Sequence, residues 1–415
     1  MRNLRIGLLL SSRQIQRANK WTTLLIIFVM MLTFLNLIAV SGVLVGLITG
    51  AERAVRAESL GDIVLTKKDG EDRIMETETV LRELSAFPEI SNFTERYSGA
   101  GVLEANYKER RDLKGERDIA SVIVTGIDPV REDEMSNLSD NVIYGEYLDP
   151  NEEGYILIGA YYTGEFAEKF GDIFETLDNI KPGVPVRLTI GNASKEFIVK
   201  GVVESKVDQV SLNTYIPERE FRRLLDRADR NADQIVVRVS KEGSDDEVKK
   251  ALTASGLSAY AKIQTFDESK PKFITDIKET MNLLGTFIGS IGIIVASITI
   301  FIIIFINAIS RRQQIGILKG IGIERRAIEI AYVLQAAFYA IVGSGLGALF
   351  TYGFLLGYFE ANPIIFPFSD GILVAPVGET FIRFVILFIV TLIAGFIPAW
   401  LIVKKNTLNS ILGRK

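Results

Sequence analysis

The chain of 415 residues contains no cysteine and no histidine. These absences exclude a zinc site of the usual kind, a cysteine nucleophile and any serine–histidine triad, because each needs a thiolate or an imidazole. They also exclude disulfides, so a domain outside the cytoplasm must be held together by a hydrophobic core. Carboxylate chemistry stays open, but the acidic residues show no focus and fit a solvated surface. We therefore predict no catalytic, metal or cofactor-binding residue in this chain.

Charge is missing from four long stretches, which are Trp21–Ala51, Thr280–Ser310, Ile330–Phe359 and Phe384–Val403. About 20 apolar residues in an α-helix cross a hydrocarbon core about 30 Å thick, so each stretch predicts a span. A buried helix of a soluble protein is usually shorter. The first stretch is about twice the length of a signal-peptide core, which favours an uncleaved anchor. The predicted fold class is a membrane protein with four transmembrane α-helices and a large α+β extracytoplasmic domain between helices 1 and 2.

The distribution of charge predicts the orientation. Residues 52–279 hold 46 acids and 32 bases, whereas the rest of the chain holds 5 acids and 15 bases. Bases gather in residues 1–20, 311–329 and 404–415, and they are scarce in 360–383, so the positive-inside rule places both termini in the cytoplasm. We predict a multi-pass protein of the cell (cytoplasmic, or inner) membrane with an interfacial helix at 1–20, a cytoplasmic tail at 404–415 and an external loop at 360–383. An acidic external face argues against nucleic acid as a partner.

The external block, residues 52–279, shows two strand–helix–strand patterns. The first has a strand at Ile63–Thr66 and a helix at Glu76–Phe87, followed by strand-like residues up to Tyr107. The second has strands at Ile235–Val239 and Ala259–Ile263 around a helix at Glu247–Leu257. The middle is richer in strands, with Gly191-Asn192 as a plausible hairpin turn. We predict a split α+β domain with a strand-rich subdomain inserted at about 113–230. Helical spacing also continues outward from the first and second spans, which predicts a short helical stalk.

The most distinctive segment is Ser310–Gly347, SRRQQIGILKGIGIERRAIEIAYVLQAAFYAIVGSGLG. We predict a cytoplasmic loop at 311–329, in which a short helix is broken by Gly316, Gly320 and Gly322 and presents an exposed docking ridge. Its candidate site residues are Arg311, Arg312, Gln314, Ile315, Gly316, Leu318, Lys319, Gly320, Gly322, Glu324, Arg325 and Arg326.

This segment resembles the C-terminal core of ABC-transporter permeases of the FtsX/MacB type. The layout is most similar to LolC/LolE-type lipoprotein-releasing permeases and MacB-type permeases. The pattern is carried by Ile315, Gly316, Leu318, Lys319, Gly322, Arg326 and Ile328, and Gln314 and Gln335 stand where glutamate is usual or frequent. The ending Ile397-Pro398-Ala399, then Lys404-Lys405 and the residues 408–412, is similar as well.

The resemblance implies a permease that works as a homo- or heterodimer and recruits two copies of a separate ABC ATPase, with 311–329 as the coupling loop that docks on the ATPase. ATP and magnesium would then be bound by the ATPase, since this chain has no Gly-x-x-x-x-Gly-Lys-Ser/Thr loop. The implied clients are lipoproteins, peptides or amphiphiles, moved by mechanical work on an external domain. The alternative is an FtsX-like subunit that activates a cell-wall hydrolase or a sensor. An ATP-independent membrane enzyme is disfavoured, because the four stretches hold no charged residue.

Pairs of glycines four residues apart occur within the spans. Such pairs let apolar helices approach closely, either inside one chain or at a dimer seam, and membrane lipid would contact the rest of their surface. The pairs are Gly42/Gly46, Gly285/Gly289, Gly343/Gly347 and Gly353/Gly357.

Overall fold

The computed structural model describes residues 2–108, 117–166, 175–362, 364–366, 369–371 and 373–404. These residues form two units. One contains Met1–Thr49 with most of the chain after Thr275, and the other contains Gly50–Ile274 with Pro367–Ser369. We call them the membrane unit and the sheet domain. Within the described residues, four helices are long and apolar enough to cross a bilayer. A mixed α/β domain lies between the first two in sequence, which confirms the predicted fold class.

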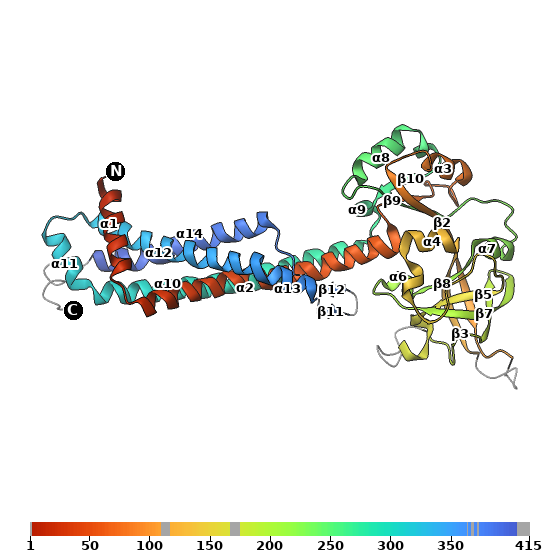
Figure 1. The fold of residues 1–415 in the computed structure, drawn as a ribbon, viewed down its shortest axis with the longest axis horizontal. Coiled ribbons are helices and arrows are strands. Elements are labelled where there is room, and N and C mark those ends of the chain that lie inside the picture. The colour runs from red at the N-terminus through yellow and green to blue at the C-terminus, as the bar shows by residue number, and fades with distance from the viewer. Residues whose placement is uncertain are drawn as a thin grey trace. The chain divides into compact units, whose positions relative to one another are not determined.

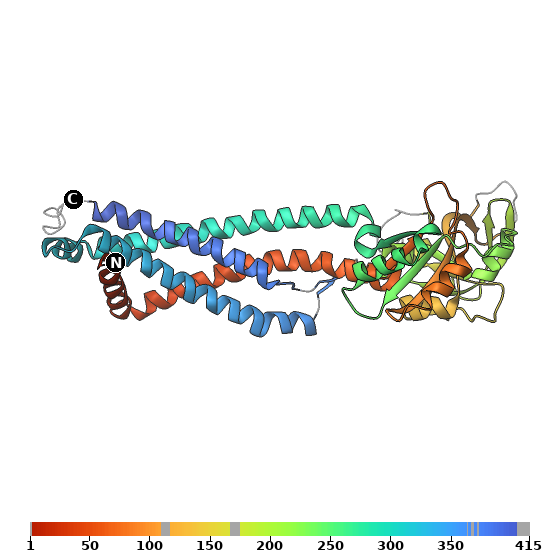
Figure 2. The same cartoon turned by 90° about the horizontal axis from the view of Figure 1, so that it is seen from above.

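The membrane unit is built from long helices that run side by side (Figures 1 and 2). Its elements are α1 (Arg2–Gln16), α2 (Lys20–Val55), α10 (Lys272–Ser310), α11 (Arg312–Gly320), α12 (Arg325–Phe350), the π-helical turn η5 (Thr351–Leu355), α13 (Leu356–Ala361), the short strands β11 (Ile364–Phe366) and β12 (Ser369–Gly371), and α14 (Val377–Val403). The helices begin earlier than the apolar stretches suggested. Because α14 starts at Val377, it carries Glu379 and Arg383, two charged residues that were predicted to lie in the external loop.

Small residues let these helices pack closely. A Cβ added at Gly343 on α12 would lie 2.4 Å from Cβ of Met30 on α2. Another at Gly395 on α14 would lie 2.6 Å from Cβ of Ala336 on α12. The resulting core contains residues of all four long helices, among them the fully buried Met30, Ile304 and Tyr332. Packing of backbones through small residues is the usual basis of helix association in lipid.

The sheet domain contains one ten-stranded sheet. Its strands are β1 (Ile63–Thr66), β2 (Ile90–Glu104), β3 (Ile119–Ile127), β4 (Val142–Gly145), β5 (Tyr155–Gly159), β6 (Pro185–Ile190), β7 (Ala193–Val203), β8 (Asn213–Pro217), β9 (Gln234–Val239) and β10 (Lys262–Thr265). Its helices and helical turns are η1 (Arg56–Leu60), α3 (Thr77–Leu84), α4 (Pro129–Ser136), η2 (Leu138–Asn141), η3 (Ala160–Tyr162), α6 (Asp208–Ser211), α7 (Glu218–Leu224), α8 (Asp245–Ala254), η4 (Leu257–Ala259) and α9 (Phe266–Ser269).

Two split βαβ units form one side of the sheet, in the order β10-β1-β9-β2. Strand β9 lies between the parallel strands β1 and β2, and it is antiparallel to both. The helices α3 and α8 contribute Val80, Leu84, Val248 and Leu252 to the hydrophobic core of the sheet domain. This is the split α+β arrangement that the sequence predicts.

The strand-rich insertion shares the sheet instead of standing apart from it. The second half of β2 pairs with β3 from Arg96–Ile127 to Glu104–Ile119, and its end also pairs with β6. The strands β2, β3, β8, β5, β7 and β6 therefore form a closed ring, because β6 pairs with both β7 and β2. The hairpin between β6 and β7 turns at Gly191-Asn192 as predicted, with Gly191 in the left-handed region. The N-terminal boundary predicted near residue 113 lies outside the described residues.

Candidate functional site

Helix α11 follows α10 after a single residue, Arg311, whose backbone N–H donates to the carbonyl of Asn307. Ile315 on its inner face is 3% exposed and lies in the core of the membrane unit with Ile328 of α12. Gly316 was predicted to break the helix. The structure contradicts that prediction, because α11 is continuous and Gly316 lies in its middle, buried. A glycine without a side chain fits a helix face that lies against its neighbours.

Helix α11 ends in a Schellman motif. The N–H of Ile323 donates to the carbonyl of Leu318 at 3.0 Å, and that of Gly322 donates to the carbonyl of Lys319 at 3.1 Å. Gly322 has a φ of +91°, the left-handed conformation that the motif requires. Leu318 and Ile323 both pack against the core of the membrane unit. The turn into α12 is therefore fixed by two backbone hydrogen bonds and an apolar contact.

Polar contacts hold the same segment against the neighbouring helices. Lys319 Nζ donates to the carbonyl of Val403 at the end of α14, at 3.2 Å. Desolvation and the nearby Arg325 lower the pKa of Lys319. Arg325 Nε donates to Glu329 Oε1 at 2.9 Å. Asn3 on α1 donates to Glu324, so α1, α11 and the ends of α12 and α14 lie at one end of the bundle (Figures 1 and 2).

What remains exposed is a surface of mixed chemistry, which we call the α11 surface. Ile317 and Ile321 are 56% and 71% exposed. The surface consists of Gln313, Gln314, Ile317, Gly320, Ile321, Gly322, Glu324 and Arg326. Of the predicted site residues, Ile315, Gly316, Leu318, Lys319 and Arg325 instead anchor this surface or support it from below. The side chain of Arg312 lies outside the described residues.

Gln335, also noted in the sequence, is buried and donates to the hydroxyl of Tyr339 at 3.3 Å.

The predicted glycine pairs divide into two groups. Gly42, Gly285, Gly289, Gly343 and Gly347 face other helices or segments of this chain, and Gly46 is buried. Gly42 lies under the segment before α14, where Val374 N–H donates to its carbonyl. Gly353 and Gly357 are exposed, and no described heavy atom outside their own helical neighbourhood lies within 4 Å of an added Cβ. A role for this last pair at a dimer seam stays a prediction.

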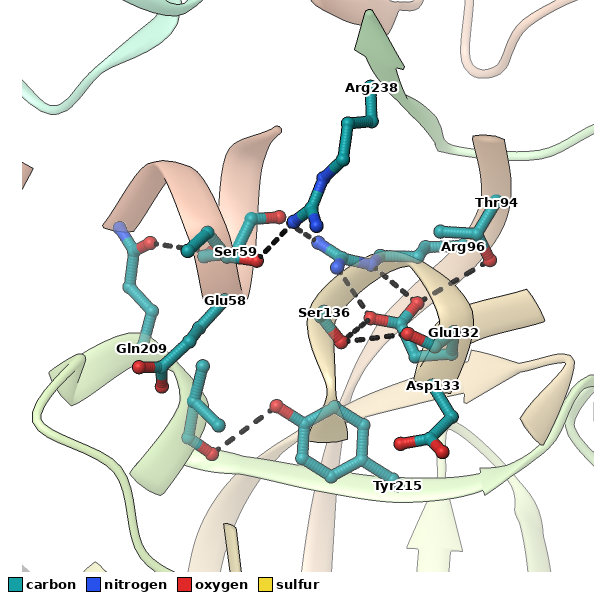
Figure 3. A network of polar contacts seen from close by, with 12 residues as sticks. Glu58, Ser59, Thr94, Arg96, Glu132, Asp133, Ser136, Gln209, Tyr215 and Arg238 are labelled. Atoms are coloured by element: carbon teal, nitrogen blue, oxygen red, sulfur yellow. Dashed lines mark hydrogen bonds and ion pairs between the residues drawn. The ribbon is translucent and has the colours of Figure 1, made fainter. Parts of the chain in front are cut away.

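A second group of functional candidates, which the sequence did not reveal, surrounds η1 in the sheet domain (Figure 3). Arg96 on β2 donates to the carbonyl of Ser59 at 2.5 Å and forms two hydrogen bonds with Glu132 on α4, at 2.6 and 2.9 Å. Burial by itself would lower the pKa of Arg96, but the charge and hydrogen bonds of Glu132 raise it above its usual value. Arg238 on β9 donates to the carbonyl of Ala57 at 2.8 Å. We call these contacts the η1 anchor.

Other contacts tie the two ends of the domain together. Val55, just before η1, lies in one apolar cluster with Phe266 and Ile274, which lie near the start of α10. Lys270 Nζ donates to Glu52 Oε1 at 2.8 Å, and both side chains are nearly buried. The segments that enter and leave the sheet domain are therefore joined to each other as well as to the sheet.

Known proteins resemble parts of this chain. A family model described as "FtsX-like permease C-terminal" matches residues 286–407, which include α11 and its surface. The macrolide export ATP-binding/permease protein MacB of Acinetobacter baylyi is 25% identical over 209 residues, 48% of this chain and 30% of that relative. An uncharacterized ABC transporter permease of Methanocaldococcus jannaschii is 24% identical over 289 residues, 65% of either chain.

Among solved structures, the periplasmic region of MacB from Actinobacillus actinomycetemcomitans covers 51% of this chain and 92% of its own, at 17% identity. The TM-score of this match is 0.36. The chain covers less than a third of the length of the Acinetobacter MacB relative.

Proposed function

We propose that this chain, an ABC-transporter permease of the FtsX/MacB type by its similarities, couples ATP hydrolysis by a separate ATPase subunit to movement of its sheet domain. The observation that carries the proposal is the α11 surface, because it lies within the family match and combines exposed isoleucines with a rigid support. Nucleotide and magnesium would be bound by the ATPase. Two permease copies, identical or paralogous, and two ATPase copies would form the working assembly.

The support beneath the α11 surface favours transmission of force. Ile315 and Leu318 pack into the core of the membrane unit, and Lys319 caps the end of α14. A load on α11 would therefore act on α12 and α14 as well as on α10. Closely packed helices move as discrete bodies because cores resist continuous deformation.

The η1 anchor supports the same proposal in the sheet domain. Helix α2 extends over 36 residues, about 54 Å at 1.5 Å per residue, which exceeds a hydrocarbon core of about 30 Å. Its end leads directly into η1, which the side chains of Arg96 and Arg238 hold through backbone carbonyls. Within the sheet domain, these hydrogen bonds hold the residues that follow α2 to β2 and β9.

We further propose that both termini lie in the cytoplasm and that the sheet domain lies outside, since bases gather in residues 1–20 and 311–329. The client would be a lipoprotein, a peptide or an amphiphile, of which the macrolides named for MacB relatives are one class. The alternative is an FtsX-like output, in which the sheet domain activates a cell-wall hydrolase or a sensor. The large size of the sheet domain favours work on a client.

The docking proposal is tested with Arg326→Glu. Arg326 is exposed in the first turn of α12, where an acidic residue favours the helix dipole, so the change should not unfold the segment. We expect an ABC ATPase to co-purify with the wild-type chain from host membranes. The amount of co-purified ATPase should fall at least about ten-fold with this variant, which corresponds to a loss of about 1.4 kcal/mol of binding free energy.

The matched control is Arg17→Glu, the same charge reversal at an exposed residue outside the α11 surface. It should retain the ATPase at the wild-type level. Equal retention by both variants, or no ATPase with the wild-type chain, would contradict docking at this surface.

A further inference from the structure

The membrane unit contains a cavity of about 400 Å³ between α2, α10 and α14. Its apolar walls include Leu37 and Val45 on α2, Ile293 on α10 and Ile386 on α14. The volume falls within the range of about 300–1,000 Å³ that is typical of small-molecule sites. Ile386 and its neighbour Ile382 are 42% and 59% exposed although they line the cavity, so it opens as a groove on the outside of the helices. In a membrane, that side faces lipid.

Two opposite charges line the same groove. Arg383 Nη2 donates to Glu379 Oε2 at 3.1 Å, one turn apart on α14. The other terminal nitrogen of Arg383, Nη1, is buried, and it has no hydrogen-bond partner among the described residues. A buried guanidinium N–H without an acceptor is costly, so this atom calls for a partner that is not part of the described chain. The Glu379 side chain is 51% exposed and can accept further hydrogen bonds.

The depth of Arg383 fits the head-group layer. Twenty residues separate it from Val403, the last residue of α14, which corresponds to about 30 Å of helix, one hydrocarbon core. If Val403 lies at one boundary of the core, Arg383 lies at the other. The apolar part of the groove, at Ile386 and Ile293, then lies at the level of the acyl chains.

We propose that this groove binds one zwitterionic aminophospholipid, such as phosphatidylethanolamine. The lipid phosphate accepts hydrogen bonds from Arg383, including Nη1. The lipid ammonium donates to Glu379, and an acyl chain lies along the apolar wall. With the orientation proposed above, the lipid belongs to the outer leaflet. The proposal itself depends only on the spans being in a bilayer and holds whether or not an ATPase docks.

The charge pattern selects this head group over the alternatives. An anionic lipid such as phosphatidylglycerol would satisfy Arg383 but would bring a second negative charge toward Glu379. Phosphatidylcholine would supply the phosphate, but its quaternary ammonium has no N–H to donate to the carboxylate. Only a lipid with both a phosphate and a primary ammonium pairs with both side chains.

The experiment uses the full chain in nanodiscs with equal amounts of phosphatidylethanolamine, phosphatidylglycerol and phosphatidylcholine, followed by native mass spectrometry of retained lipid. We expect the wild-type chain to retain phosphatidylethanolamine at least about three-fold over its bulk share. Arg383→Gln should lose retained lipid. Glu379→Gln should keep phosphate binding but lose the preference for phosphatidylethanolamine over phosphatidylglycerol.

Lys278→Gln is the matched control, since Lys278 is a base near the start of α10 that does not line the groove, and its retained lipid should not change. If the wild-type chain retains the three lipids in the proportions of the nanodisc, the proposed site is wrong. A preference for phosphatidylglycerol would overturn it as well. A second copy of the chain could cover the groove instead. Because the chain has no cysteine, Ile382→Cys tests this directly, and efficient disulfide cross-linking between two copies would overturn the lipid site.

Discussion

The ion pair of Arg96 and Glu132 has side chains only 11% and 2% exposed, and it supports η1 through the carbonyl of Ser59. Removing one member of a buried pair leaves an uncompensated charge, which typically costs about 3–5 kcal/mol. We expect Arg96→Met to lower the stability of the sheet domain by that amount, measured as faster hydrogen exchange of β2 and β9 in the full chain.

The control is the double variant Arg96→Met/Glu132→Met, which removes both charges of the same ion pair. It should recover most of the lost protection, since replacing a whole buried pair by apolar groups is often neutral. If the double variant is no more stable than Arg96→Met, then the destabilisation comes mainly from the lost hydrogen bond to the Ser59 carbonyl and not from the unpaired carboxylate of Glu132.

At the scale of a structural element, the turn after α11 depends on one left-handed residue. An added Cβ meets no described atom within 4 Å at Gly322 or at Gly320, so space does not distinguish the two glycines. The backbone does, because only Gly322 has a positive φ. We expect Gly322→Ala to destabilise the turn by about 1–2 kcal/mol and Gly320→Ala to be neutral or stabilising.

Hydrogen exchange of residues 312–323 measures this difference, and co-purification of the ATPase reports its consequence. Gly322→Asn should be milder than Gly322→Ala, because asparagine visits the left-handed region more readily. Equal exchange in the two alanine variants would show that the Schellman motif does not limit the order of this segment.

Elements with strong local signals could be predicted from the sequence. The spans follow from uncharged length, and β1, β9 and the turn at Gly191 follow from strand-like patterns and turn residues. Gly316 was misjudged because a helical glycine is tolerated where the helix face is buried, and burial depends on neighbours distant in sequence. The η1 anchor was missed for a related reason, since Arg96 and Glu132 meet only when β2 and α4 pack.

The charged first turns of α14 were missed because each predicted span was limited to residues without charge, and Glu379 and Arg383 lie before that limit. Helices continue past the hydrocarbon core into the head groups, where charged side chains are solvated or meet lipid. The groove beside Arg383 could therefore be recognised only from packing. The tail at 405–415, which supported the family resemblance through residues 408–412, lies outside the described residues.

For the whole molecule, the proposed function requires a single topology, with the α11 surface on the side where ATP is present. The absence of cysteine makes this testable with single-cysteine variants at exposed residues, which are Asp72, Gln314 and Glu360. We expect a membrane-impermeant maleimide to label Asp72→Cys and Glu360→Cys in intact cells or spheroplasts. Gln314→Cys should be labelled to a similar extent only after permeabilisation, because bases in residues 1–20 and 311–329 hold those segments inside. Labelling of Gln314→Cys in intact cells would rule out docking to a cytoplasmic ATPase even if every helix forms as described.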